Sequence, residues 1–138
     1  MTILANKLYY QILKQENHRL LEFYWLNHDQ PMSNEDFKRG SKELTQFILQ
    51  ERPDTLLISY QDMSYIIPYD MQLWFIEHEA PTWLNSSLKR VALVVNHNLM
   101  LHSSLIDVIE HSNDMFNIII QHKFFENTEK ALFWLSEI

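Results

Sequence analysis

The sequence of residues 55–76 is TLLISYQDMSYIIPYDMQLWFI, an apolar run followed by a polar break and a second apolar segment. The first run, Thr55–Ser59, is short and bounded by polar residues, which favours a buried central strand. Pro68 then suits the first turn of a helix over Tyr69–His78. Because sites in open α/β sheets lie at the carboxyl ends of strands, the loop Gln61–Pro68 is the first candidate for a functional site.

The residues before this stretch predict a hairpin and a helix. Leu8–Leu13 and Leu20–Leu26 are rich in leucine and aromatic residues, and each is typical of a strand. Ser33 is a suitable helix cap, and the helix that it begins must end before Pro53. Gly40 falls on the apolar stripe of this helix, which indicates close packing of the helix on the sheet.

The residues after it predict two more strands and two more helices. Arg90–Val95 and Phe116–Phe124 are apolar runs typical of strands, with Ile118 and Ile120 on one face of the second and Ile119 on the other. One helix is indicated by Leu101, Leu105, Val108 and Ile109; the last has Asn127 as its cap and Ala131, Trp134, Leu135 and Ile138 on its core face. The predicted fold is α/β: one domain over residues 1–138, with a single open mixed sheet of about five strands, in which an N-terminal hairpin precedes βαβαβα.

Composition excludes several functions. The chain has a single glycine, whereas a phosphate-cradling loop needs several, so glycine-rich nucleotide sites are excluded. The absence of cysteine removes disulfides, thiolate nucleophiles and cysteine-ligated metals. A net charge of −7 without a basic stripe argues against nucleic acid as a partner. Residues 1–13 lack the apolar core of a signal peptide and no run reaches the roughly 18 apolar residues of a membrane span, so a cytoplasmic protein is expected.

The catalytic residue types form no motif. No pair of the seven histidines has the helical spacing with an intervening glutamate that marks a zinc protease. No serine lies in a G-x-S-x-G elbow, which a single glycine cannot build. We therefore predict no enzyme, with no catalytic residue, metal site or cofactor.

The predicted helix Tyr69–His78 has two apolar stripes where a surface helix needs only one. They consist of Met71, Trp74 and Phe75 on one face, and of Tyr69, Leu73 and Ile76 on another. Two explanations remain open for the second stripe. Either Ala80–Leu84 or another helix covers it, or it forms a protein–protein surface.

Asp62-Met63-Ser64-Tyr65-Ile66 resembles the D-[aliphatic or aromatic]-S-x-[aliphatic] signature of the STAS domain, the SpoIIAA-like fold of anti-sigma-factor antagonists. In that family the signature also follows a buried strand and precedes a helix. The end of the chain, from Phe124-Phe125-Glu126-Asn127 to Ala131, Trp134 and Leu135, is similar to the tail of small STAS-like proteins. The resemblance implies a SpoIIAA-like sheet and a regulatory, protein-binding role.

One position departs from the family pattern. The serine that is phosphorylated in the antagonists stands four residues after the first serine of the motif, and here that position is Pro68. Proline has no hydroxyl to modify, so the kinase-controlled partner switch of the family is not expected at this position.

The sequence therefore predicts a non-enzymatic STAS-like interaction or regulatory module, with an unidentified protein partner or a homodimer. Its predicted interaction surface comprises Asp62, Met63, Ser64, Tyr65, Tyr69, Leu73 and Ile76. The alternative is a carrier or sensor of a small apolar ligand, since STAS-like folds resemble the CRAL-TRIO lipid-binding domains and several aromatic residues could line a cavity: Tyr65, Trp74, Phe75 and Trp83. A hydrolase is the residual alternative.

Overall fold

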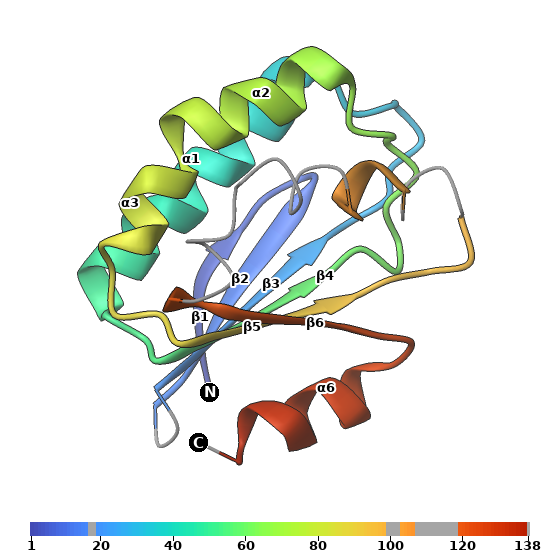
Figure 1. The fold of residues 1–138 in the computed structure, drawn as a ribbon. Coiled ribbons are helices and arrows are strands. Elements are labelled where there is room, and N and C mark those ends of the chain that lie inside the picture. The colour runs from blue at the N-terminus through green and yellow to red at the C-terminus, as the bar shows by residue number, and fades with distance from the viewer. Residues whose placement is uncertain (17–18, 99–102, 107–118, 138) are drawn as a thin grey trace.

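The computed structural model describes residues 1–16, 19–98, 103–106 and 119–137. In chain order the elements are β1 (Thr2–Asn6), β2 (Tyr10–Gln15), β3 (Leu20–Trp25), α1 (Asn34–Glu51), β4 (Thr55–Ser59), α2 (Tyr69–His78), α3 (Ala80–Leu84), β5 (Arg90–Val94), β6 (Gln121–Phe125) and α6 (Thr128–Leu135). The described strands form one sheet in the order β1-β2-β3-β4-β5-β6 (Figure 1). β1, β2 and β3 pair antiparallel, whereas β3, β4, β5 and β6 pair parallel.

The sheet carries a hydrophobic core on each of its faces. α1, α2 and α3 cover one face, and α6 lies on the other (Figure 1). β4 shows the alternation that this requires, because Leu56 and Ile58 belong to the α1–α3 core while Leu57 belongs to the α6 core. All three side chains are at most 4 % exposed, which confirms β4 as a buried central strand.

Most of the predicted elements are confirmed. β4 and α2 have the predicted bounds, and β5 begins at Arg90 as expected. Ser33 caps α1 in a full capping box: its hydroxyl accepts from the Asp36 N–H at 3.2 Å, and the Asp36 carboxylate accepts from the Ser33 N–H at 2.9 Å. Asn127 caps α6 by accepting from the Lys130 N–H at 2.9 Å.

The prediction of five strands is wrong, because the described residues contain six. Residues 2–6 form an additional antiparallel strand, β1, at the edge of the sheet, and the predicted strand Leu8–Leu13 begins only at Tyr10. Lys7 to Tyr9 make the turn between them, with the Lys7 N–H bonded to the Tyr10 carbonyl at 2.9 Å. The class and the single mixed sheet are as predicted.

The last predicted strand is also displaced. β6 starts at Gln121, so Ile119 and Ile120 precede it rather than alternate along it. The remaining predicted strand residues, 116–118, lie outside the described residues, as do Leu101, Val108, Ile109 and Ile138 of the predicted helices. Leu105 lies in a described helical segment, 103–106, and packs into the α1–α3 core.

Gly40 places α1 directly on the sheet. A Cβ atom at this position would lie 2.7 Å from Cη2 and 2.8 Å from Cζ3 of Trp25 on β3. The predicted close packing of helix on sheet is confirmed.

A buried polar cluster ties α1 to the junction of α2 and α3. The Thr45 hydroxyl accepts from the Trp83 indole N–H at 2.8 Å and lies 2.8 Å from the Glu79 carboxylate. All three side chains are less than 9 % exposed, so each supplies the partner that the others need in a dry environment.

Candidate functional site

A hollow lies at the carboxyl ends of the parallel strands. β3, β4 and β5 are parallel, so their carboxyl ends lie at the same end of the sheet. The residues that follow these strands meet there: Asn27 after β3, Gln61–Ser64 after β4, and Asn96 after β5. With Leu8 and Leu26 they surround an open volume of about 650 Å³. The sequence-based expectation that this edge carries the site agrees with the position of the hollow.

Asn96 fixes the shape of the loop after β4. Its side-chain amide lies within hydrogen-bond distance of three loop carbonyls: Tyr60 at 3.1 Å, Gln61 at 3.2 Å and Met63 at 3.3 Å. Its carbonyl oxygen accepts from the Asn98 N–H at 2.7 Å. One side chain therefore satisfies several backbone groups of a loop that has no regular structure of its own.

The four predicted loop residues have different environments. Asp62 and Ser64 are exposed, and the Ser64 hydroxyl lies 3.4 Å from the Asn27 side-chain oxygen. Met63 is only 3 % exposed and belongs to the α1–α3 core, so it anchors the loop and offers little surface to a partner. Tyr65 is half-buried, and its hydroxyl donates to the Asn34 side chain at 2.6 Å.

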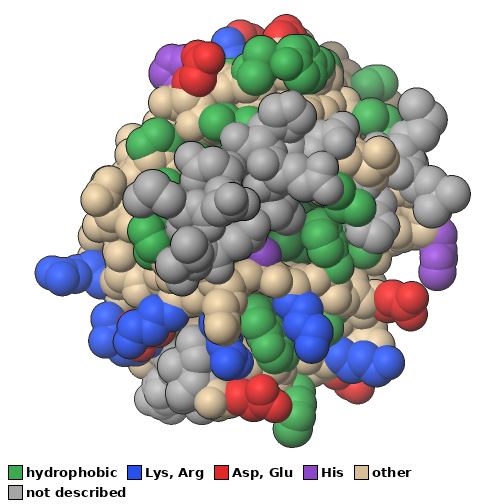
Figure 2. Space-filling view, in the orientation of Figure 1, with side chains coloured by type: hydrophobic (Ala, Val, Ile, Leu, Met, Phe, Trp, Pro, Cys, Tyr) green, Lys and Arg blue, Asp and Glu red, His purple; other side chains and the backbone are tan. Residues whose placement is uncertain are grey.

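The two stripes of α2 also differ. Met71 is buried, and Trp74 packs edge-on to Phe37 of α1 with ring centroids 6.3 Å apart, so the first stripe faces the molecule. In the second stripe Leu73 and Ile76 are half-buried, whereas Tyr69 is 62 % exposed. Hydrophobic side chains are visible at the top of the molecule, over α2, in Figure 2. The second stripe is thus partly covered, and it is open to solvent at the end that adjoins the loop.

The hollow is polar and nearly uncharged. Asparagine and glutamine amides, the Ser64 hydroxyl and the Asp62 carboxylate line it, with Leu8, Leu26 and Met63 as the apolar part. No lysine or arginine is among the described residues around it. Such a surface can exchange hydrogen bonds with a neutral or cationic partner, and it offers no cation for a phosphate.

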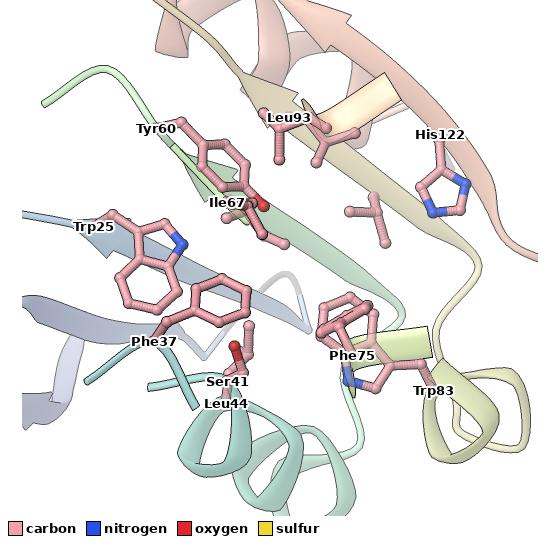
Figure 3. Close-up of a pocket in the computed structure, with 13 residues that line it drawn as sticks. Trp25, Phe37, Ser41, Leu44, Tyr60, Ile67, Phe75, Trp83, Leu93 and His122 are labelled. Atoms are coloured by element: carbon pink, nitrogen blue, oxygen red, sulfur yellow. The ribbon is translucent and has the colours of Figure 1, made fainter. Parts of the chain in front are cut away.

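A second space lies between the sheet and α1–α3. It is an apolar cavity of about 60 Å³ whose aromatic walls include Trp25, Phe37, Phe75 and Trp83 (Figure 3). Phe75 and Trp83 are two of the four aromatic residues predicted for a ligand cavity. The other two, Tyr65 and Trp74, do not line it.

His122 of β6 also lines this cavity. Burial lowers the pKa of its imidazole to about 4, against the opposing effect of a hydrogen bond with the backbone of Ile120. Its ring is therefore uncharged near neutral pH. Tyr60, at the end of β4, is another lining residue, and burial raises the pKa of its hydroxyl above the ordinary value.

Sequence reasoning missed several of the residues that shape the two spaces. Asn27 and Asn96 carried only the general signal of polar residues that follow strands. Ser41 was expected only on the apolar stripe of its helix, and His122 only within a strand. Within the described ranges, no group of three or more histidine and carboxylate side chains gathers as metal ligands would. No helix in the described part of the chain is long and apolar enough to cross a membrane.

Comparisons with protein-family models, with curated proteins and with solved structures found no significant match to this chain.

Proposed function

We propose that this chain is a non-enzymatic interaction module of STAS-like regulatory type, and that it recognises a protein partner through the loop Asp62–Pro68 and the start of α2. The observation that carries the proposal is a fixed loop that leads into a helix with an exposed aromatic residue at its start. Asn96 holds the loop by its backbone carbonyls, Asp62 and Ser64 are exposed on this loop, and Tyr69 is exposed at the start of the helix that follows it.

The chemistry of this surface suits protein recognition. Tyrosine is among the residues that contribute most to binding energy at interfaces, and Tyr69 is 62 % exposed. The hollow lined by the preceding loop supplies hydrogen-bonding groups, as the polar part of an interface does. A loop fixed before binding also loses little conformational freedom when a partner docks.

Regulation in this proposal does not depend on a phosphate at the family position, because Pro68 occupies it. The partner is recognised by hydrogen bonding and apolar contact, so binding should change little with phosphatase treatment. A cytoplasmic setting is part of the proposal, and a sequence without cysteine, which needs no oxidising compartment, is compatible with it.

The test uses Tyr69 and a matched control on the opposite side of the sheet. Phe133 on α6 is 71 % exposed, so it is at least as accessible as Tyr69. A photo-crosslinking amino acid is placed at each position in turn, and the full chain is irradiated in the cells that produce it. The proposal expects one discrete adduct from position 69 that Ser64→Arg abolishes, and none from position 133. Equal labelling from both positions would refute it.

A homodimer is the partner that can be tested with the purified chain alone. Sedimentation velocity over a dilution series should then show a dimer that Tyr69→Ala weakens and Phe133→Ala leaves intact. A monomer at all concentrations would reject self-association and leave a different protein as the partner.

The cavity favours a second candidate function, a carrier of a small ligand. About 60 Å³ is well below the roughly 300 Å³ of ordinary ligand pockets, so this candidate ranks behind the interaction module. Native mass spectrometry of the purified chain tests it: an added mass that is lost on denaturation supports a carrier, and a bare chain after mild purification counts against one.

A further inference from the structure

The edge strand β1 is paired on one side only. It pairs antiparallel with β2, and no other strand of the described sheet lies on its outer side. The backbone N–H and C=O groups along such an edge are a template for a further strand. Proteins protect these edges with charged side chains, proline, β-bulges or a covering element.

The two edges of the described sheet differ in this protection. β6, with the sequence QHKFF, carries the exposed Lys123. β1, with the sequence TILAN, contains neither a charged residue nor proline. Its one protective feature of these kinds is a shift in the register with β2 between Ile3 and Ala5. β1 is therefore the less protected of the two edge strands.

Apolar side chains are exposed along β1 and at both of its ends. Ile3 of the strand is 55 % exposed, Met1 before it is 75 % exposed, and Leu8 in the turn after it is 54 % exposed. These side chains would lose contact with water if a further strand paired with β1.

The charges near the ends of β1 favour an antiparallel partner of the same sequence. Lys7 follows the C-terminal end of the strand and is exposed. At the N-terminal end the exposed Glu16 carboxylate accepts from the Thr2 hydroxyl at 2.7 Å, and the Met1 amino group offsets part of its charge. Antiparallel pairing of two copies brings Lys7 of each to the end that bears Glu16 of the other, whereas parallel pairing would place Lys7 beside Lys7.

We infer that β1 is a self-association surface, on which the β1 strand of a second copy of this chain pairs antiparallel across a two-fold axis. The arrangement is closed, because each copy uses the same edge and the two sheets become one. β6 of each copy then forms an outer edge of the joint sheet. The inference goes beyond the proposed partner-binding surface at Asp62–Pro68 and does not depend on it.

The face on which Ile3 lies sets the register of this pair. Ile3 is opposite Leu13 of β2, and Leu13 is opposite Glu22 of β3. Because Leu21 and Phe23, on either side of Glu22, belong to the α1–α3 core, Ile3 lies on the α6 side of the sheet. A two-fold axis perpendicular to the sheet keeps this side common to both copies. We therefore place Ile3 of one copy directly opposite Ile3 of the other.

A single cysteine tests this register in the full chain. The sequence contains no cysteine, so one introduced thiol can form a disulfide only between copies. Directly opposite residues of antiparallel strands have Cα atoms roughly 4.5–5.5 Å apart, within the roughly 4.4–6.8 Å that a disulfide spans. Leu49→Cys on α1 is the matched control for Ile3→Cys, because Leu49 is 52 % exposed and Ile3 is 55 % exposed. With oxidised glutathione at low protein concentration, Ile3→Cys should give a linked dimer many times faster than Leu49→Cys, and equal rates would refute the inference.

Sedimentation velocity tests the association without a covalent link. The natural chain should form a dimer over a dilution series. Ile3→Lys places two like charges opposite each other and removes an apolar pair, so it should weaken the dimer about tenfold. Leu49→Lys is the matched control and should leave the dimer intact. Circular dichroism and urea unfolding verify that both variants fold.

The outcomes separate this inference from the proposed function. A natural chain that is monomeric at all concentrations overturns the β1 pairing and leaves the cross-linking test at Tyr69 to decide on a different protein partner. A dimer that Tyr69→Ala weakens and Ile3→Lys leaves intact also overturns it, in favour of association through α2. A dimer that only Ile3→Lys weakens supports the β1 pairing.

Discussion

Replacing Gly40 by alanine sets two effects of known direction against each other. Alanine is the better helix former by about 1 kcal/mol, so an unobstructed site in α1 would gain stability. The new methyl, however, would lie 2.7 and 2.8 Å from two atoms of the Trp25 ring, where van der Waals contact begins near 3.4 Å. One side chain has to move.

The surroundings of Trp25 determine which effect is larger. Its ring is 4 % exposed, stacks on Phe37 with centroids 5.7 Å apart, and meets Phe23 edge-on at 4.7 Å. A ring enclosed in this way yields only if its neighbours move as well, and overpacking of this kind costs roughly 1–3 kcal/mol. When the gain in helix propensity is subtracted from the cost of overpacking, Gly40→Ala should lower the free energy of unfolding by about 1 kcal/mol.

Urea unfolding followed by tryptophan fluorescence measures this change. Gln46 is exposed on the same helix, so comparing Gln46→Gly with Gln46→Ala gives the propensity gain without a clash. In a Trp25→Phe background the two shortest contacts of the new methyl are absent and the contact with Tyr10 Cδ1 at 3.1 Å remains, so the cost of Gly40→Ala should fall. If Gly40→Ala stabilises the natural chain as much as Gln46→Ala stabilises Gln46→Gly, the ring has room and the close-packing argument is wrong.

Three further outcomes are expected. Between about pH 6.5 and 4 the unfolded chain binds a proton at His122 that the folded chain does not, so stability should fall on acidification by up to about 3 kcal/mol; pH-dependent urea melts should lose this component in His122→Leu. Asn96→Ala should destabilise by about 1–2 kcal/mol and speed amide hydrogen exchange at residues 61–64, because three loop carbonyls lose a donor; unchanged exchange would contradict the anchoring role. Thr45→Val should cost about 2 kcal/mol in thermal unfolding, since Glu79 and Trp83 lose a buried partner, and a neutral effect would mean that water replaces the hydroxyl.

Local signals in the sequence were sufficient to predict an element wherever the residue types themselves determine the backbone conformation. Ser33 and Asp36 set the start of α1 through the capping box, and Pro53 sets its end by restricting the residue before it. In the structure the helix runs from Asn34 to Glu51, between Ser33 and Pro53. Thr55–Ser59 was recognisable because a strand buried on both faces has a continuous apolar centre, here Leu56 to Ile58.

The edges of the sheet gave no comparable signal. The two edge strands are β1, with the sequence TILAN, and β6, with the sequence QHKFF. At least every second side chain of such a strand faces water, so the alternation of apolar and polar residues along it is weak. The predicted strand Phe116–Phe124 therefore began in the apolar residues that precede β6, whereas β6 runs from Gln121 to Phe125. β1 is identified as a strand by its antiparallel pairing with β2 in the structure.

The candidate site was predictable in position but not in composition. A loop after a central parallel strand is a general expectation, and Asp62 and Ser64 are exposed there. That Asn96 would reach back to hold this loop depends on the register between β4 and β5, which pairs Ser59 with Val94. Ser41 and His122 reach the same cavity from α1 and β6, and only the assembled fold brings them together.

The order of the strands has a consequence for how the chain folds. Every strand of the described sheet pairs with the strand before it in the sequence, so no strand is inserted between two that have already formed. The contact order is therefore lower than in α/β sheets whose central strand is added late, and lower contact order goes with faster folding. As the nascent chain lengthens, each βα unit can dock on the edge left by the previous one. Within the described sheet, the two strands that keep a free edge are β1 and β6.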